Sequence, residues 1–155
     1  MATRKEMTKR LDKLSQTVQR CEGMWKKDGV WVSRCVTSGK VCPCFGKNCM
    51  QGGHFIPRGV KSLRWDERNL HPQCQRDNGF RNGAYIEYSN WFINRYGFDT
   101  YKEFMEIYEA HKQGKARPFN IQEIKDMYNY WLKKGRELEE KTDQQLFPKS
   151  WKEEK

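Results

Sequence analysis

The first twenty residues alternate apolar and polar positions with the period of an α-helix. Met7, Leu11, Leu14 and Val18 recur at spacings of four and three, which places them on one stripe. The other face carries the basic residues Arg4, Lys5, Lys9, Arg10, Lys13 and Arg20. We therefore predict a basic amphipathic helix, and we expect its stripe to pack on the core of this chain or on a second copy of it.

Two β-prone segments follow this helix. Residues 30–35 come after Gly29 and run into a Thr-Ser-Gly-Lys turn signal, so we predict a strand and a turn there. A second short strand is expected at residues 54–56, because Pro57 ends it. Residues 58–68 are basic and irregular, and a short helix is expected to begin at Pro72, where the first helical turn tolerates proline.

The C-terminal half has the pattern of helices with aromatic faces. Four aromatic residues share the face of a first helix, namely Tyr85, Tyr88, Phe92 and Tyr96. Gly97 stands where such a helix would end in a left-handed residue. We expect these aromatic stripes to form much of the core.

Two capping boxes predict the starts of two further helices. Thr100 with Glu103 forms the first, and Asn120 with Glu123 forms the second. Gly135 is expected to weaken the end of the last helix, because glycine has a low helix propensity. The tail that follows mixes charges of both signs and has no apolar stripe, so we expect it to fray.

Composition and charge narrow the class of protein. A chain of 155 residues has about the length of one domain, and its 36% of apolar residues include no run longer than three, which excludes a membrane-spanning protein. Aromatic residues make up 14% of the chain and argue for a folded core. The net charge of +10 indicates a polyanionic partner, with nucleic acid ahead of a membrane surface and plain solubility as the alternative.

The cysteines point to metal chemistry. The N-terminus has no apolar segment of a secretory signal, so we expect a cytoplasmic protein, of the bacterial host if a phage encodes it. Four of the six cysteines, Cys35, Cys42, Cys44 and Cys49, crowd into fifteen residues. In a reducing compartment such crowding favours a metal site over disulfides. Cys21 stands apart after the first helix and is expected in the core.

A histidine and several asparagines could hydrolyse a phosphodiester. That reaction needs a base with a pKa near neutral, a divalent metal and a group that holds the base in place. His54, with an ordinary pKa of about 6.5, suits the first task, and Asn69 could fix its tautomer by a hydrogen bond. Asn78 and Asn82, one helical turn apart, offer carbonyl oxygens that suit Mg²⁺.

The central motif resembles a known family of nucleases. The segments Gly-His-Phe-Ile and Leu-Arg-Trp-Asp-Glu-Arg-Asn-Leu-His-Pro-Gln-Cys, followed by Asn78, resemble the HNH nucleases, also called ββα-metal or His-Me finger nucleases. More narrowly, the chain is similar to the phage NinG (Rap) recombination endonucleases, which cut branched DNA such as Holliday junctions and D-loops. The similarity covers roughly residues 8–140 and implies that His54 is the general base, Asn69 the central asparagine and Asn78 a ligand of catalytic Mg²⁺ or Mn²⁺.

The chain departs from the family at the catalytic metal. Many HNH motifs carry an Asp or His just before the base, but here Gly53 stands in that place. A replacement ligand would have to come from elsewhere, and His71 or Asn82 is our candidate. His71 could instead be a surface histidine, and His111 is expected to face solvent near a helix end.

The chain also departs from the family at the structural zinc. The family usually has two Cys-x-x-Cys pairs that hold Zn²⁺, but here the pairs read Cys35 with Ser38 and Cys74 with Asp77. Cys42, Cys44 and Cys49 could join Cys35 or Cys74 to restore the four ligands that zinc prefers. The alternative is a loop of free thiols without metal.

Basic residues surround the proposed centre, where phosphate contact is the natural interpretation. They are Arg58, Lys61, Arg64, Arg68, Arg76 and Arg81.

These observations together predict a small α+β protein. We expect a basic N-terminal helix at 1–28, a ββα-metal core with a zinc-stapled loop at 29–84, a helical bundle at 85–140 and a frayed tail at 141–155. The predicted function is a metal-dependent endonuclease for Holliday junctions, D-loops and flaps, with DNA as partner, no membrane contact and a possible homodimer. The alternatives are a non-catalytic, zinc-stabilised DNA-binding module and a sequence-specific HNH nuclease of the homing or restriction type.

Overall fold

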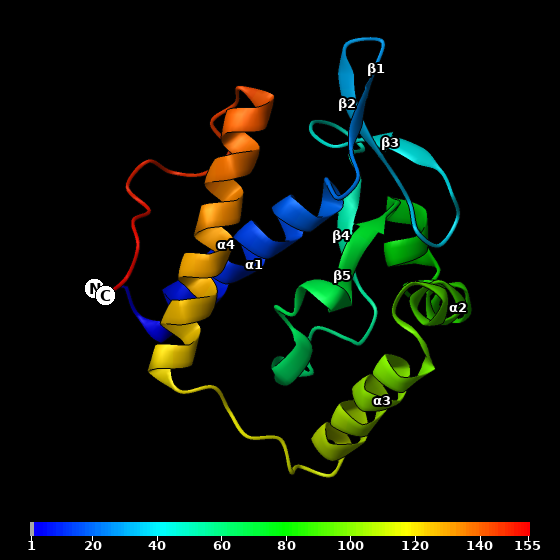
Figure 1. Ribbon diagram of the computed structural model, residues 1–155, viewed down its shortest axis with the longest axis vertical. Helices are drawn as coiled ribbons and strands as arrows, with labels where there is room; N and C mark the ends of the chain where they lie inside the picture. Colours follow the sequence, from blue (N-terminus) through cyan, green and yellow to red (C-terminus); the bar gives the residue numbers. More distant parts are fainter. Residues whose placement is uncertain (1) are drawn as a thin grey trace.

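The computed structural model describes residues 2–155 and shows a mixed α+β architecture (Figure 1). The α-helices are α1 (Arg4–Arg20), α2 (Tyr85–Tyr96), α3 (Phe98–Lys112) and α4 (Ile121–Thr142). The strands are β1 (Trp25–Lys27), β2 (Val30–Arg34), β3 (Val41–Pro43), β4 (Gln51–His54) and β5 (Leu70–Gln73). Three short helical turns complete the fold, namely η1 (Lys61–Leu63), η2 (Glu67–Asn69) and η3 (Arg76–Phe80). None of the helices in the described residues is both long and apolar enough to span a membrane.

Helices α1 and α4 cross and form one core (Figure 1). The predicted stripe of α1 is buried at Met7, Leu11 and Leu14, which pack with Tyr128 and Trp131 of α4. The stripe therefore packs in the core of this chain, so it is not free to bind a second copy. The predicted capping box at the start of α4 is confirmed, because the side chains of its two residues bond reciprocally to the backbone.

Two small antiparallel sheets lie beyond α1. One has the order β1-β2-β3, and the other is the β4-β5 hairpin, in which Gly53 pairs with His71 and His54 with Leu70. The strand predicted at residues 30–35 is confirmed as β2, whereas β4 ends at His54 instead of beginning there. The helix predicted from Pro72 is wrong: Pro72 lies in β5, whose only partner strand is β4, and edge positions tolerate proline.

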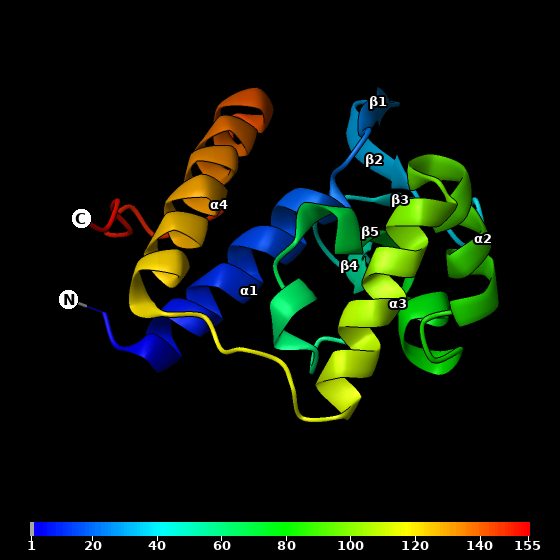
Figure 2. The same ribbon diagram turned by 60° about the horizontal axis from the view of Figure 1, so that its bottom comes forward.

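The hairpin is held between α1 on one side and α2 with α3 on the other (Figure 2). On the first side Gly52 is required, because an added Cβ would lie 2.6 Å from the backbone oxygen of Gln16. On the other side an aromatic core forms around Phe55, on which Phe92 stacks, and Phe104 packs against Phe92 in a tilted orientation. The β4-β5 hairpin is therefore the central element onto which both helical layers pack.

The junction between α2 and α3 corrects one predicted cap. Gly97, with φ of 89°, ends α2 as expected from its conformational freedom. Helix α3 begins directly after it, at Phe98, so Thr100 and Glu103 lie inside the helix and form no capping box. Gly97 is both the last residue of the α2 terminus and the residue before α3, so the chain has no further residue there to act as a separate N-cap.

The segment after α4 is packed, which differs from the frayed tail that we predicted. Helix α4 runs through Gly135 to Thr142, and Gly135 allows close approach, because an added Cβ would lie 2.9 Å from side chains of Leu14 and Phe147. Arg136 donates to the carbonyls of Phe147 and Trp151, among others. These backbone contacts and the buried ring of Phe147 hold the tail in place. The sequence does not indicate this packing, because the tail has no apolar stripe.

Candidate functional site

His54 lies at the end of β4 with one ring nitrogen fixed. Its Nε2 is 2.8 Å from the carbonyl oxygen of Arg64. A carbonyl oxygen can only accept, so Nε2 carries the proton and Nδ1 of the neutral ring holds a lone pair. Nδ1 has no hydrogen-bond partner among residues 2–155. His54 thus has the tautomer that a general base requires.

The surroundings of His54 favour its neutral form. Burial of the partly exposed ring lowers the pKa of His54 below its ordinary value of 6.5, and the positive charges of Arg58 and Arg64 act in the same direction. The Arg64 carbonyl and the Asp12 carboxylate oppose this shift without reversing it. The imidazole is therefore neutral at pH 7 and able to accept a proton.

Asn69 organises the loop between β4 and β5 and does not touch the ring of His54. Its buried side chain accepts from the Ile56 amide at 2.7 Å and donates to the carbonyls of Ile56 and Leu63, each at 3.0 Å. Leu63 directly precedes Arg64, whose carbonyl holds His54. Asn69 is thus a positioning residue that acts through the loop backbone, and the direct hydrogen bond to the imidazole that we expected is absent.

The loop is also tied to α1. Arg64 and the indole nitrogen of Trp65 both donate to Asp12, each at 2.9 Å from Oδ1. The guanidinium of Arg64 is thereby largely buried in an ion pair. This contact fixes the Arg64 carbonyl that orients His54.

The six basic residues predicted to contact phosphate fall into two groups. Arg64, Arg68 and Arg81 are paired with carboxylates, so their charges serve internal contacts first. The other three are exposed and form no ion pair within the described part of the chain; they are Arg58, Lys61 and Arg76. Only this second group carries an unshared positive charge.

A basic groove on α1 extends the positive surface. It is open to solvent and lined mainly by side chains of the first three turns of α1, with Arg64 at its edge. The lining residues are Arg4, Lys5, Thr8, Lys9, Asp12 and Arg64. Arg64 therefore both lines this groove and, through its carbonyl, binds the candidate base.

The predicted catalytic metal ligands do not gather around His54. Asn78 donates to Gln51 at 2.7 Å, at the opposite end of β4 from His54. Gln51 and His54 are three residues apart along the strand, which corresponds to about 10 Å between their backbones. Asn82 is exposed on a left-handed turn beyond η3. Neither asparagine forms a hydrogen bond with His54 within residues 2–155.

Gly53 leaves no place for the missing acidic ligand. A Cβ added at Gly53 would lie 2.0 Å from Oε1 of Gln73, so the Gln73 side chain fills the space. Gln73 is itself held by a hydrogen bond to the Gly83 carbonyl. The residues present therefore do not form a Mg²⁺ site beside His54, and we assign no chemistry to such an ion.

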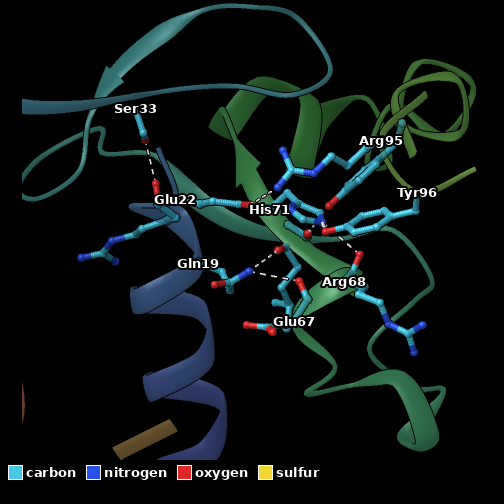
Figure 3. Close-up of polar contacts among 12 residues, drawn as sticks. Gln19, Glu22, Ser33, Glu67, Arg68, His71, Arg95 and Tyr96 are labelled. Atoms are coloured by element: carbon cyan, nitrogen blue, oxygen red, sulfur yellow. Dashed lines mark hydrogen bonds and ion pairs between the residues drawn. The ribbon is translucent and has the colours of Figure 1, made fainter. Parts of the chain in front are cut away.

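The surface position considered for His71 is wrong, because the structure buries it (Figure 3). Its ring is fully buried, with Nδ1 2.5 Å from Glu22 and Nε2 2.9 Å from the Arg68 carbonyl. The hydroxyl of Tyr96 lies 3.1 Å from the same Nε2. His71 joins the residues after α1 to β5 and α2, and both of its nitrogens are occupied.

A second cluster unites the two incomplete cysteine pairs. Ligand atoms of Cys35, Cys74 and Asp77 all lie within 4.8 Å of one another, and all three residues are buried. Thr37 donates to Asp77 at 2.6 Å, and the Ser38 hydroxyl is 3.7 Å from the Cys74 sulfur. Asp77 is a candidate ligand that the sequence analysis did not name, although it stands in the fourth position of a Cys-x-x-Cys pattern and could have been found there.

The remaining thiols divide between two environments. Cys42 shares the buried cluster of Cys35 and Cys74, while Cys44 packs with Cys21 in another apolar cluster. Cys21 is buried, which confirms its expected place in the core, and Cys49 is partly exposed. Of the five thiols predicted for zinc, the structure therefore gathers Cys35, Cys42 and Cys74.

The Cys35 thiol is prepared for ionisation. Burial opposes its ionisation, but hydrogen bonds with the Ser38 and Thr37 hydroxyls outweigh this effect and lower the pKa of Cys35 below its ordinary value. Thiolates are the form in which cysteine binds metals. The cluster is thus chemically suited to a soft or borderline cation.

These features define a small, basic α+β protein with a positioned histidine and a buried cluster of thiols and a carboxylate. The family model described as Bacteriophage Lambda NinG protein matches residues 1–140. The chain therefore belongs to the NinG family, a phage family related to recombination. Comparisons with curated proteins and with solved structures find no match.

Proposed function

We propose that this chain is a DNA endonuclease that hydrolyses phosphodiester bonds in branched recombination intermediates, such as Holliday junctions, D-loops and flaps. The observation that carries the proposal is the fixed tautomer of His54, which leaves an unprotonated Nδ1 beside exposed basic side chains. Membership of the NinG family supports a recombination substrate. The HNH resemblance of the same segment supports the reaction class.

His54 has a defined part in the proposed reaction. Its Nδ1 removes a proton from a water molecule, and the water oxygen attacks the phosphorus in line with the leaving sugar oxygen. The new phosphorus–oxygen bond replaces the bond to the leaving oxygen, which takes up a proton from solvent water as it departs. Asn69 and Arg64 hold the loop so that the base keeps its orientation.

The basic surface offers a path for the DNA backbone. Arg58 and Lys61 extend from the loop after His54, and the groove on α1 leads toward the same loop through Arg64. A duplex contacting both would release many counterions, so binding should weaken steeply with salt. The charges support affinity for DNA of any sequence.

We further propose a structural zinc in the cluster of Cys35, Cys74 and Asp77. Cys42, the third thiol of the same buried cluster, is our choice for the fourth ligand. Because the cluster is buried, it is a closed site that stabilises the fold and takes no part in catalysis. It would join the end of β2 to the start of η3.

A second candidate function is a non-catalytic, zinc-stabilised DNA-binding module. The observation that favours it is the separation of Asn78 from His54, together with the Gln73 side chain beside Gly53. Such a protein would bind branched DNA through the same basic surfaces without cutting it.

One experiment separates these functions. The purified full chain is incubated with Mg²⁺ or Mn²⁺ and with four-way, flapped and linear DNA of the same sequence. We expect cutting of the branched substrates, a loss of about 10²- to 10⁴-fold in His54→Gln and no loss in the matched variant His111→Gln. Equal cutting by His54→Gln contradicts the proposal.

Other outcomes identify the alternatives. Binding of branched DNA without cutting in either metal identifies the non-catalytic module. Cleavage confined to one sequence motif identifies a nuclease of the homing or restriction type. The mass of the complex on a four-way junction tests the predicted homodimer, since two strands must be cut to resolve a junction.

A further inference from the structure

The turn after η3 presents an aromatic side chain to solvent. Phe80 is 91% exposed, the highest value among the large apolar residues of the described chain. It ends η3 and precedes Arg81, at a point where the chain reverses toward α2. A single exposed apolar residue is common on protein surfaces, so the meaning of Phe80 depends on how it is held and on the charges beside it.

The turn that carries Phe80 is braced by hydrogen bonds. The Gly83 amide donates to the Asp77 carbonyl at 2.7 Å, and the Arg81 amide donates to the Arg76 carbonyl at 2.9 Å. Gln73 donates to the Gly83 carbonyl from β5. Phe80 is therefore held outward by a fixed turn, so its exposure is a property of the fold.

One unpaired positive charge lies beside Phe80 in the sequence. Arg76 is exposed and forms no ion pair within residues 2–155, whereas Arg81, on the other side of Phe80, is paired with Asp77 and Glu87. The carboxylate of Asp77 is buried and accepts hydrogen bonds from Thr37 and Arg81. An exposed aromatic ring near an unpaired arginine is complementary to a nucleic acid, whose bases are aromatic and whose backbone is anionic.

We propose that Phe80 is a wedge that stacks on unpaired or unstacked bases at the branch point of DNA, while Arg76 contacts the neighbouring phosphates. This inference rests on the proposed function and adds the group that distinguishes branched from linear substrate. Every base offers a face for stacking, and a branch point already exposes such faces. A continuous duplex must first be unstacked, which costs free energy and disfavours binding.

The test measures binding, so it does not depend on cleavage. Dissociation constants of wild type, Phe80→Ala, Phe80→Trp and Phe98→Ala are determined for a four-way junction and for linear duplex of the same sequence. Phe98 is the matched control, because it is also exposed, at 59%, but lies at the start of α3. We expect Phe80→Ala to lose about 10-fold in affinity for the junction only.

The remaining variants and outcomes decide the proposal. Phe80→Trp should keep the junction preference, and Phe98→Ala should resemble wild type. The wedge is contradicted if Phe80→Ala binds as wild type does, if it loses affinity for both substrates equally, or if wild type has no preference. A monomer–dimer change in Phe80→Ala during sedimentation would instead identify a self-association surface. A junction preference that depends on Phe80 without any cutting supports the wedge and refutes only the nuclease activity.

Discussion

The Nε2 atom of His54 donates to the carbonyl of Arg64, and the side chain of the same arginine binds Asp12 on α1. One residue thus connects the orientation of the candidate base to the first helix. The base is held by backbone whose position depends on an ion pair, so the geometry of the site depends on how α1 packs.

The pH dependence of cleavage should reflect the lowered pKa of His54. Only the neutral ring can accept a proton, so the rate falls as the pH drops through the pKa of His54. Because burial lowers the pKa of His54 below 6.5, this fall should lie on the acid side of that value. Single-turnover rates on a four-way junction from about pH 5 to 8 test this expectation. A midpoint at or above 6.5 contradicts it.

Removing the Asn69 side chain should destabilise the loop. Asn69→Ala leaves buried backbone groups of Ile56 and Leu63 without partners, at a cost of roughly 1–3 kcal/mol. Urea unfolding measures the change, and Asn94→Ala, at an exposed position of α2, serves as the control. Equal stability of the two variants would show that the loop is held by other contacts. Cleavage by Asn69→Ala should also fall, since Arg64 loses its fixed position.

Purified protein should contain one tightly bound zinc. Metal binding free energy is folding free energy, so a chelator or Cys74→Ser should lower the melting temperature. A loss of about 2 kcal/mol corresponds to about 4–8 °C for a chain of this size. Elemental analysis and thermal unfolding provide the readouts, with Cys21→Ser, in a different cluster, as the control for zinc content. Metal-free protein with the same melting temperature would refute the site.

Restoring an acidic residue before the base should be costly. Gly53→Asp places a Cβ against Gln73, and such overpacking costs about 1–3 kcal/mol. Gln73→Ala should relieve part of this cost, so the double variant should be more stable than the sum of the single effects. Gly59→Asp, where an added Cβ meets nothing within 4 Å, is the control. Strict additivity would show that Gln73 is not the obstacle.

Sequence patterns predicted the elements that depend on local signals. The period of α1 and the Asn120–Glu123 cap of α4 lie within a few neighbouring residues, and both are present. Pro72 was misread as a helix start because the pairing of β5 with β4 depends on residues that are distant in the sequence. Local preference cannot reveal such pairing.

The candidate site was predictable in its residue types more than in its geometry. His54 and the thiols of Cys35 and Cys74 stand out by chemistry alone. The partner of His71 is Glu22, 49 residues away, and no spacing rule connects them. The positions of Asn78 and Asn82 depend on where η3 begins, which a helix placed at Pro72 shifts by about one turn.

Because the tail is packed, the folded structure extends beyond the region that the family model matches. The NinG match ends at residue 140, within α4, whereas Phe147 is buried against α1 and α4. A chain shortened to the matched region would lose that ring and the two backbone amides that Glu139 binds. Residues 141–155 therefore belong to the folding unit, and the region that the family model matches ends inside that unit.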